Sequence, residues 1–258
     1  MPEGDTVYRE AFHLNQALQG ATVTGWDIRV PAFATSDLTG ERIDGVASRG
    51  KHLLHRVGDF TLHSHLKMEG SWHLYRPGSP WKRPAFQARA VVTTADWVSV
   101  GFDLGVVELI PRTEEETVVG YLGPDLLGAD WNSDEAIARL TAAPEVPTAV
   151  ALLDQRNLAG LGNVFANELC FLRGVLPSRP IGETDVPALV ALSSRLILAN
   201  RDRVERTTTG DARPGRKVWV YGRAGKPCLR CGTRIRAGKL GQDELSLRDT
   251  YWCPRCQS

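Results

Sequence analysis

Four cysteines near the C-terminus constrain this chain more than any other feature of its sequence. They occur as two Cys-x-x-Cys pairs, Cys228 with Cys231 and Cys253 with Cys256, separated by 21 residues. Two such pairs can place four thiolates tetrahedrally around Zn²⁺, and metal binding then supplies folding free energy to a segment too short for its own core. Because four thiolates leave no open coordination position, the spacing predicts one structural zinc ion in a β-hairpin.

The rest of the composition is that of an ordinary globular protein, with 42% hydrophobic and 24% charged residues. No apolar run approaches the roughly 20 residues that span a bilayer, and the first residues are acidic where a secretory signal is basic and apolar. We therefore expect a cytoplasmic protein that does not enter a membrane, in which cysteine pairs indicate metal rather than disulfides. The fifth cysteine, Cys170, lies in an apolar stretch and is expected to be a buried free thiol.

The net charge of +1 conceals a basic C-terminal half. Residues 149–258 contain 18 basic and 10 acidic side chains. Such a surplus fits a polyanionic partner, although a solvated basic surface would give the same count.

Hydrophobic periodicity divides the chain into a β-rich and a helical part. A helix is expected at 5–19, and short β-type runs separated by turn residues follow up to about residue 110, which is typical of a sandwich. Apolar spacing then predicts four helices, and Lys217–Tyr221 begins a β-rich tail that contains the cysteines. The expected fold is α+β with two domains, divided into 1–112 (helix and antiparallel β-sandwich), 113–130 (linker), 131–210 (helical) and 218–258 (zinc finger). The individual strands are expected at Ala21–Val30, Lys51–Val57, Phe60–Leu66, Ala88–Thr93 and Trp97–Phe102, and the later helices at Ser133–Leu140, Thr148–Asp154, Val164–Leu172 and Val186–Arg203.

Two further motifs have both a chemical and a purely structural interpretation. The glycine-containing stretch from Asn157 to Asn163 predicts a turn between two helices, with Asn163 capping the second helix, whose N-terminus suits a phosphate. An ordinary helix–turn–helix corner would look the same. If Met1 is removed, Pro2 presents a secondary amine that titrates near pH 8 and can attack a sugar C1′ carbon, with Glu3 as proton donor. A proline after the initiator methionine is, however, common.

Lysine and histidine residues of the β-rich part are also candidates. Lys51 precedes an apolar strand and is either a surface lysine or a cation poised at a phosphate or a leaving base. His63 and His65 lie on one strand face, where packed or hydrogen-bonded rings are favoured over a metal site because no cysteine or acid pair accompanies them. Between the cysteine pairs, four cations can face phosphates, namely Arg234, Arg236, Lys239 and Arg248.

These motifs, in this order, resemble those of the formamidopyrimidine-DNA glycosylase/endonuclease VIII family over essentially the full chain. The resemblance rests on six stretches: Met-Pro-Glu-Gly at the start, Ser-Arg-Gly-Lys51-His-Leu-Leu, His65-Leu-Lys-Met68-Glu-Gly, Gly160-Leu-Gly-Asn163-Val-Phe-Ala-Asn-Glu, Val220-Tyr-Gly-Arg and Tyr251-Trp-Cys-Pro-Arg-Cys-Gln. It implies a β-sandwich domain joined to a helix–two-turns–helix domain with a zinc finger, and DNA in the cleft between them.

The resemblance also implies a monomeric, bifunctional glycosylase and abasic-site lyase that acts on damaged DNA by β,δ-elimination. Pro2 would form the Schiff base, Glu3 would be the general acid, and Lys51 would assist proton transfer and contact the DNA backbone. Asn163 and Arg248 would hold phosphates around the flipped nucleotide, with Arg248 also acting in the second elimination. Met68 matches the wedge that fills the vacated stack. A non-catalytic damaged-DNA-binding paralogue and a zinc-ribbon regulator are the alternatives.

Three positions depart from the family pattern, and two of them bear on substrate choice. Phe102-Asp103-Leu104-Gly105 replaces the Arg-Arg-Phe-Gly motif of purine-specific members, and the interval from Thr209 to Tyr221 is short for a loop that encloses 8-oxoguanine. Both favour oxidised pyrimidines and abasic sites, as in an actinobacterial branch of endonuclease VIII. Asp5-Thr6 stands where many relatives have Pro-Glu, which removes one carboxylate beside the nucleophile.

Overall fold

The structure is a computed structural model that describes residues 2–258, so the fate of Met1 lies outside the described residues. The chain forms two compact units, the first ending at Tyr121 and the second running from Leu122 to Ser258. No helix among residues 2–258 combines the length and apolarity needed to cross a bilayer.

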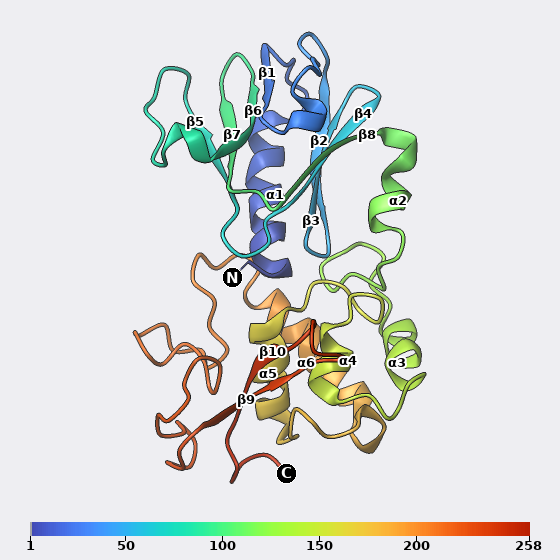
Figure 1. The fold of residues 1–258 in the computed structure, drawn as a ribbon, viewed down its shortest axis with the longest axis vertical. Helices are drawn as coiled ribbons and strands as arrows, with labels where there is room; N and C mark the ends of the chain where they lie inside the picture. The colour runs from blue at the N-terminus through green and yellow to red at the C-terminus, as the bar shows by residue number, and fades with distance from the viewer. Residues whose placement is uncertain (1) are drawn as a thin grey trace. The chain divides into compact units, whose positions relative to one another are not determined.

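Unit 1 is one long helix with two four-stranded antiparallel sheets (Figure 1). Helix α1 (Gly4–Leu18) lies against β2, β3 and β5. Its buried residues Val7, Ala11, Leu14 and Leu18 follow helical spacing and join the core of this unit. The strands of the first sheet lie in the order β1 (Gly25–Ile28), β6 (Ala88–Thr93), β7 (Val98–Phe102) and β5 (Ser71–Tyr75). The strands of the second sheet lie in the order β2 (Ile43–Arg49), β3 (His52–Val57), β4 (Phe60–His65) and β8 (Val106–Pro111).

The expected helix and antiparallel β-sandwich are confirmed, with differences in detail. The run Ala21–Val30 contains only the four-residue strand β1, because Thr22 instead bridges Arg42 outside the sheets. Strands β2, β5 and β8 were not delimited by the sequence. The expected linker also contains a short helix, α2 (Glu115–Val119), which follows a 3-10 turn.

Unit 2 packs helices α3 (Ser133–Thr141), α4 (Thr148–Leu153), α5 (Asn163–Arg173) and α6 (Val186–Leu198) around one core (Figure 1). Helix α5 has the most buried surface, with all residues from Asn163 to Phe171 inside. A two-stranded hairpin of β9 (Arg236–Leu240) and β10 (Arg248–Trp252) packs on α5, with Arg248 opposite Leu240. The helical domain with a β-hairpin finger agrees with the expected fold class.

Two expectations for unit 2 were wrong, whereas the end of α4 agrees to within one residue. Lys217–Tyr221 forms turns rather than a strand, because the amides of residues 219–221 donate to a buried carboxylate instead of to a neighbouring strand. Helix α6 ends at Leu198, five residues before the expected end at Arg203. Just after this end, Asn200 Oδ1 accepts a hydrogen bond from the Thr207 amide. Helix α4 ends at Leu153, so Asn157 lies in the following turn.

Candidate metal centre and nucleic-acid interface

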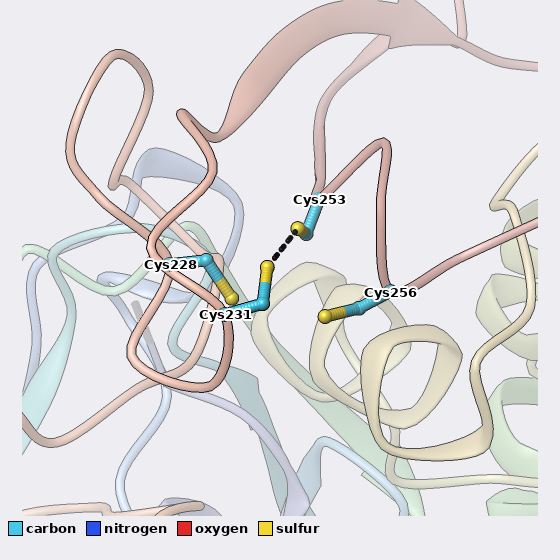
Figure 2. Close-up of side chains that lie close together, drawn as sticks. All are labelled: Cys228, Cys231, Cys253 and Cys256. Atoms are coloured by element: carbon cyan, nitrogen blue, oxygen red, sulfur yellow. Dashed lines mark hydrogen bonds between the residues drawn. The ribbon is translucent and has the colours of Figure 1, made fainter.

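Four thiols meet at one point of unit 2 (Figure 2). The sulfur atoms of Cys228, Cys231, Cys253 and Cys256 all lie within 4.8 Å of one another, and those of Cys231 and Cys253 are 3.5 Å apart. Sulfurs bound tetrahedrally at about 2.3 Å from zinc would be separated by roughly 3.8 Å, so the cluster fits such an ion. Among residues 2–258 it is the one group of histidine, cysteine and acidic ligand atoms gathered closely enough to hold a metal.

The knuckle turns that carry these thiols are stabilised by local bonds and by helix α5. The Cys228 amide donates to Thr233 O at 2.8 Å, and Gly232 takes a positive φ of 79° that closes the first turn. In the second turn, Gln257 Oε1 accepts from the Cys253 amide, and its Nε2 donates to Val175 O just beyond α5. The fifth cysteine, Cys170, is fully buried inside α5, as expected, and burial raises the pKa of its thiol to about 12.

Asn163 joins α5 to the finger hairpin rather than capping the helix. Gly162 occupies the N-cap position, and the Asn163 Nδ2 group donates to Asp249 O at 2.8 Å. One turn later, Asn167 Oδ1 accepts from the Tyr251 amide at 2.6 Å. These bonds bring Asn163 beside the strand that begins with the exposed Arg248, so the structure unites the two phosphate-binding candidates of unit 2.

The N-terminus of α1 lies at the same end of unit 1 as Lys51. Asn15 Oδ1 accepts from Val46 N at 2.8 Å, so the helix runs back from this contact toward the turn between β2 and β3, where Lys51 is located (Figure 1). Pro2 is partly exposed, whereas Glu3, the N-cap residue of α1, is completely buried.

The residues around Lys51 make this end of the sheet electropositive. Burial, together with the smaller effects of His63, His65, Lys67 and Lys51, lowers the pKa of His52 to about 3. Burial likewise lowers the pKa of His65 to about 4, assisted by Lys67 and Lys51. Both rings are therefore neutral at pH 7, and the positive charge at this edge comes from the lysines.

The histidines form a hydrogen-bonded chain, as the sequence favoured. His52 Nδ1 is 2.8 Å from His63 Nε2, and His63 Nδ1 is 2.8 Å from Glu108 Oε2. At the other end, His52 Nε2 is 3.1 Å from the Tyr121 hydroxyl. Glu108 was missed, because it comes from β8, 45 residues after His63, and only the pairing of β4 with β8 makes them neighbours.

Met68 lies in an exposed turn that a distant arginine braces. Its exposed fraction is 60%, and its neighbour Lys67 takes a φ of 53°, an unusual conformation for a residue with a side chain. The Arg83 guanidinium donates to Glu69 O of this turn at 3.4 Å and also pairs with Asp103, which itself has a φ of 45°. Arg83 had no signal in the sequence, since its partners lie 14 and 20 residues away.

Comparisons with known proteins agree with this architecture. The family model of the formamidopyrimidine-DNA glycosylase N-terminal domain matches residues 1–103. The DNA-(apurinic or apyrimidinic site) lyase Nei2 of Mycolicibacterium smegmatis is 50% identical in sequence, and the match covers 100% of this chain and 99% of the relative. The probable endonuclease 8 2 of Streptomyces coelicolor is 51% identical, and the match covers 100% of this chain and 94% of the relative. A crystal structure of the LlFpg protein with THF-DNA and an inhibitor superposes with a TM-score of 0.81 at 25% identity, covering both chains completely. The chain belongs to the formamidopyrimidine-DNA glycosylase/endonuclease VIII family.

Proposed function

We propose that this protein excises oxidised bases from DNA and cuts the resulting abasic site through a covalent intermediate on Pro2. The enzyme class follows from the family: a DNA glycosylase with abasic-site lyase activity. The mycobacterial relative is named as a lyase of apurinic or apyrimidinic sites, and the solved relative is complexed with DNA. The observation that most supports the covalent mechanism is the complete burial of the Glu3 carboxyl group directly beside Pro2, at the same end of unit 1 as Lys51.

The proposed chemistry begins with the secondary amine of Pro2, freed by removal of Met1. Its nitrogen lone pair forms a bond to C1′ while the bond from C1′ to the damaged base breaks. The base leaves with the electron pair of the broken bond and takes up the proton lost from the proline nitrogen, and Glu3 protonates the sugar oxygen as the ring opens to a cationic iminium. This cation acidifies the C2′ proton, so elimination of the 3′ phosphate follows and then elimination of the 5′ phosphate.

DNA contacts are assigned to both units. In unit 1, Lys51 supplies a cation to the DNA backbone. In unit 2, the side-chain amide of Asn163 and the guanidinium group of Arg248 contact backbone phosphates. Met68, exposed on its braced turn, is the proposed wedge for the space left by the flipped nucleotide, whose extrusion costs a few kcal/mol. We assign Zn²⁺ to the four-thiol cluster, where it would stabilise the finger without entering the reaction. We also propose that the protein is a monomer whose domains have the boundaries expected from the sequence: 1–112, 113–130, 131–210 and 218–258.

Oxidised pyrimidines are the proposed substrates in preference to 8-oxoguanine. The turn at 102–105 lacks the family's arginine, and its Asp103 is engaged by Arg83. The segment from Thr207 to Lys217 is short and hydrogen-bonded to itself, which leaves little chain to fold over a purine. Base-excision rates on thymine glycol, dihydrouracil, 8-oxoguanine and uracil, with the strand-cleavage rate on an abasic site, test this preference, which a faster rate on 8-oxoguanine than on the oxidised pyrimidines would contradict.

Borohydride trapping on an abasic-site oligonucleotide tests the mechanism. Wild type should form a covalent adduct, Pro2→Gly should lose most of it, and Glu3→Gln should slow base excision by at least 100-fold. Glu135→Gln, which changes an exposed carboxylate on α3, is the matched control and should behave as wild type. Undiminished trapping by Pro2→Gly would refute the mechanism. If wild-type protein that has been shown to begin at Pro2 is not trapped, the non-catalytic DNA-binding alternative would be favoured. Mass spectrometry of the N-terminus establishes that terminus.

A further inference from the structure

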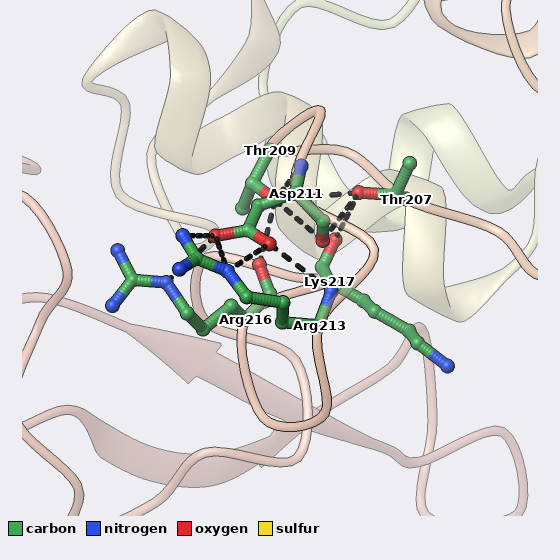
Figure 3. Close-up of polar contacts among 6 residues, drawn as sticks. All are labelled: Thr207, Thr209, Asp211, Arg213, Arg216 and Lys217. Carbon is green, nitrogen blue, oxygen red and sulfur yellow. Dashed lines mark hydrogen bonds and ion pairs between the residues drawn. The ribbon is translucent and has the colours of Figure 1, made fainter.

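The loop between α6 and the finger is organised around one carboxylate (Figure 3). Asp211 accepts from Arg213 through Nε at 2.9 Å and Nη2 at 2.6 Å, and from Arg216 Nε at 2.7 Å. The hydrogen bonds with Arg213 lower the pKa of Asp211 well below its usual range, so the carboxylate remains ionised. Two guanidinium groups are thereby fixed on one acidic residue.

Threonine side chains close the same loop. Thr209 Oγ1 donates to Arg216 O at 2.6 Å and accepts from the Asp211 amide at 3.0 Å, while Thr207 Oγ1 donates to Lys217 O at 3.1 Å (Figure 3). The loop is therefore held internally along its length and does not depend on a ligand for its shape.

Both ends of the loop are anchored on helix α5 by the fully buried Glu168. Its carboxylate accepts from the Thr208 hydroxyl at the start of the loop and from Trp219 N and Val220 N after its end, the last two at 2.7 and 2.8 Å. Asn163, the proposed phosphate-binding residue, begins this same helix. The loop and Asn163 are thus parts of one rigid framework within unit 2.

The arginines keep unused donors that face solvent. The side chain of Arg213 is 73% exposed and that of Arg216 is 52% exposed. Asp211 occupies one edge of Arg213 and only Nε of Arg216, so both Nη groups of Arg216 and Nη1 of Arg213 have no acceptor within residues 2–258. Two positive charges against one negative leave a surplus of +1. Exposed ion pairs add little to stability, so this network is better explained by what it presents than by what it stabilises.

We infer that the Asp211 loop is a preformed binding site for DNA backbone phosphate, separate from the contacts assigned to Asn163 and Arg248. The two Nη groups of Arg216 match two phosphate oxygens and Nη1 of Arg213 adds a further donor, and fixing these groups in advance removes the entropy lost on ordering long side chains. Asp211 is then a positioning residue, which acts through the arginines. The inference rests on the proposed function only in that DNA is the ligand.

Binding to a duplex with a non-cleavable abasic-site analogue, measured over a range of KCl concentrations, tests this inference. Arg213→Gln with Arg216→Gln should weaken binding on the order of 10-fold at 0.1 M salt and reduce the slope of log K against log salt by about 2. Unchanged affinity and slope would overturn the proposal.

Asp211→Asn separates positioning from charge. A purely electrostatic surface should bind DNA more tightly when a negative charge is removed, whereas loss of two prearranged guanidinium groups should weaken binding by about 5- to 10-fold. Equal or tighter binding by this variant would overturn the positioning role. Asp27→Asn and Arg29→Gln are the matched controls, because this exposed pair at the end of β1 has the same spacing in sequence as Asp211 and Arg213 and should leave binding unchanged.

Trapping at saturating abasic DNA distinguishes this inference from the proposed mechanism. The loop variants should regain wild-type trapping once DNA is saturating, since they alter affinity alone. Failure of wild type to trap would refute the mechanism while leaving the binding comparison valid.

Discussion

Glu10 provides a quantitative test of the packing between α1 and the sandwich. Its Oε2 accepts from the Trp72 amide of β5 at 3.0 Å, and burial raises the pKa of the Glu10 carboxyl from 4.5 to about 7, against the lowering effects of that hydrogen bond and of Arg9. One pKa unit is equivalent to about 1.36 kcal/mol, so the rise corresponds to about 3 kcal/mol at most. Because Glu10 keeps some exposure, we expect between about 1 and 3 kcal/mol.

The direction of this effect follows from proton linkage. Below pH 4.5 both the folded and the unfolded chain hold the proton, so Glu10 has no effect on the pH dependence of stability. Between pH 4.5 and about 7 the unfolded chain ionises first, and the unfolding free energy of wild type falls as pH rises. Glu10→Gln cannot ionise, so its stability relative to wild type should increase by about 1 to 3 kcal/mol over this interval.

Urea denaturation at several pH values between 4.5 and 8 measures this difference, and carbon NMR titration of the Glu10 carboxyl gives its pKa directly. Glu10→Ala is the matched control. Glu10→Ala has the same pH dependence as Glu10→Gln, because neither side chain ionises. It leaves the Trp72 amide without its acceptor, which should make it about 1 to 3 kcal/mol less stable than Glu10→Gln at every pH. A stability difference between Glu10→Gln and wild type that stays constant across this range would refute the reasoning.

Three further perturbations test other parts of the structure. Cys253→Ser should bind less than the one zinc ion per chain expected for wild type, and its finger should unfold. Metal analysis and hydrogen exchange of β9 and β10 measure these two effects, and an undiminished metal content would contradict the assignment of zinc to the four-thiol cluster. Glu168→Gln should destabilise unit 2 by about 2 kcal/mol in urea, because an amide N–H₂ then faces backbone donors, whereas exposed Glu183→Gln should have no effect. Arg83→Ala should speed hydrogen exchange in the Met68 turn, and unchanged exchange would show that the brace is dispensable.

Local periodicity was sufficient for elements that are amphipathic on their own. Helix α5 was expected at Val164–Leu172 and spans Asn163–Arg173, because its apolar residues and the left-handed Gly174 after it specify both length and end. Strand β2, with the sequence Ile-Asp-Gly-Val-Ala-Ser-Arg, has no such pattern. It is a strand because β3 pairs with it on both sides of an irregularity at Asp44 and because α1 covers it.

The candidate site shows the same division. The four-cysteine cluster could be found from the sequence, since each cysteine pair lies within one short turn and the spacing itself indicates a group that could hold a metal. Arg83, Glu168 and Asp211 could not be found as positioning residues. Two of them act on partners 14 to 53 residues away, and the partners of Asp211 are close in sequence but resemble any surface ion pair until the loop geometry is known.

The sequence by itself determined the fold class, the four-cysteine cluster and the family, because these depend on short-range spacing and on motifs that keep their order along the chain. Only the tertiary structure decided that Asn163 holds the hairpin instead of capping its helix, that Glu108 completes a histidine chain, and that two arginines are fixed on Asp211. The physical reason is that a hydrogen bond requires its two groups within about 3 Å in a suitable direction. Strand pairing and helix packing set that distance between residues far apart in the chain, and no local pattern encodes it.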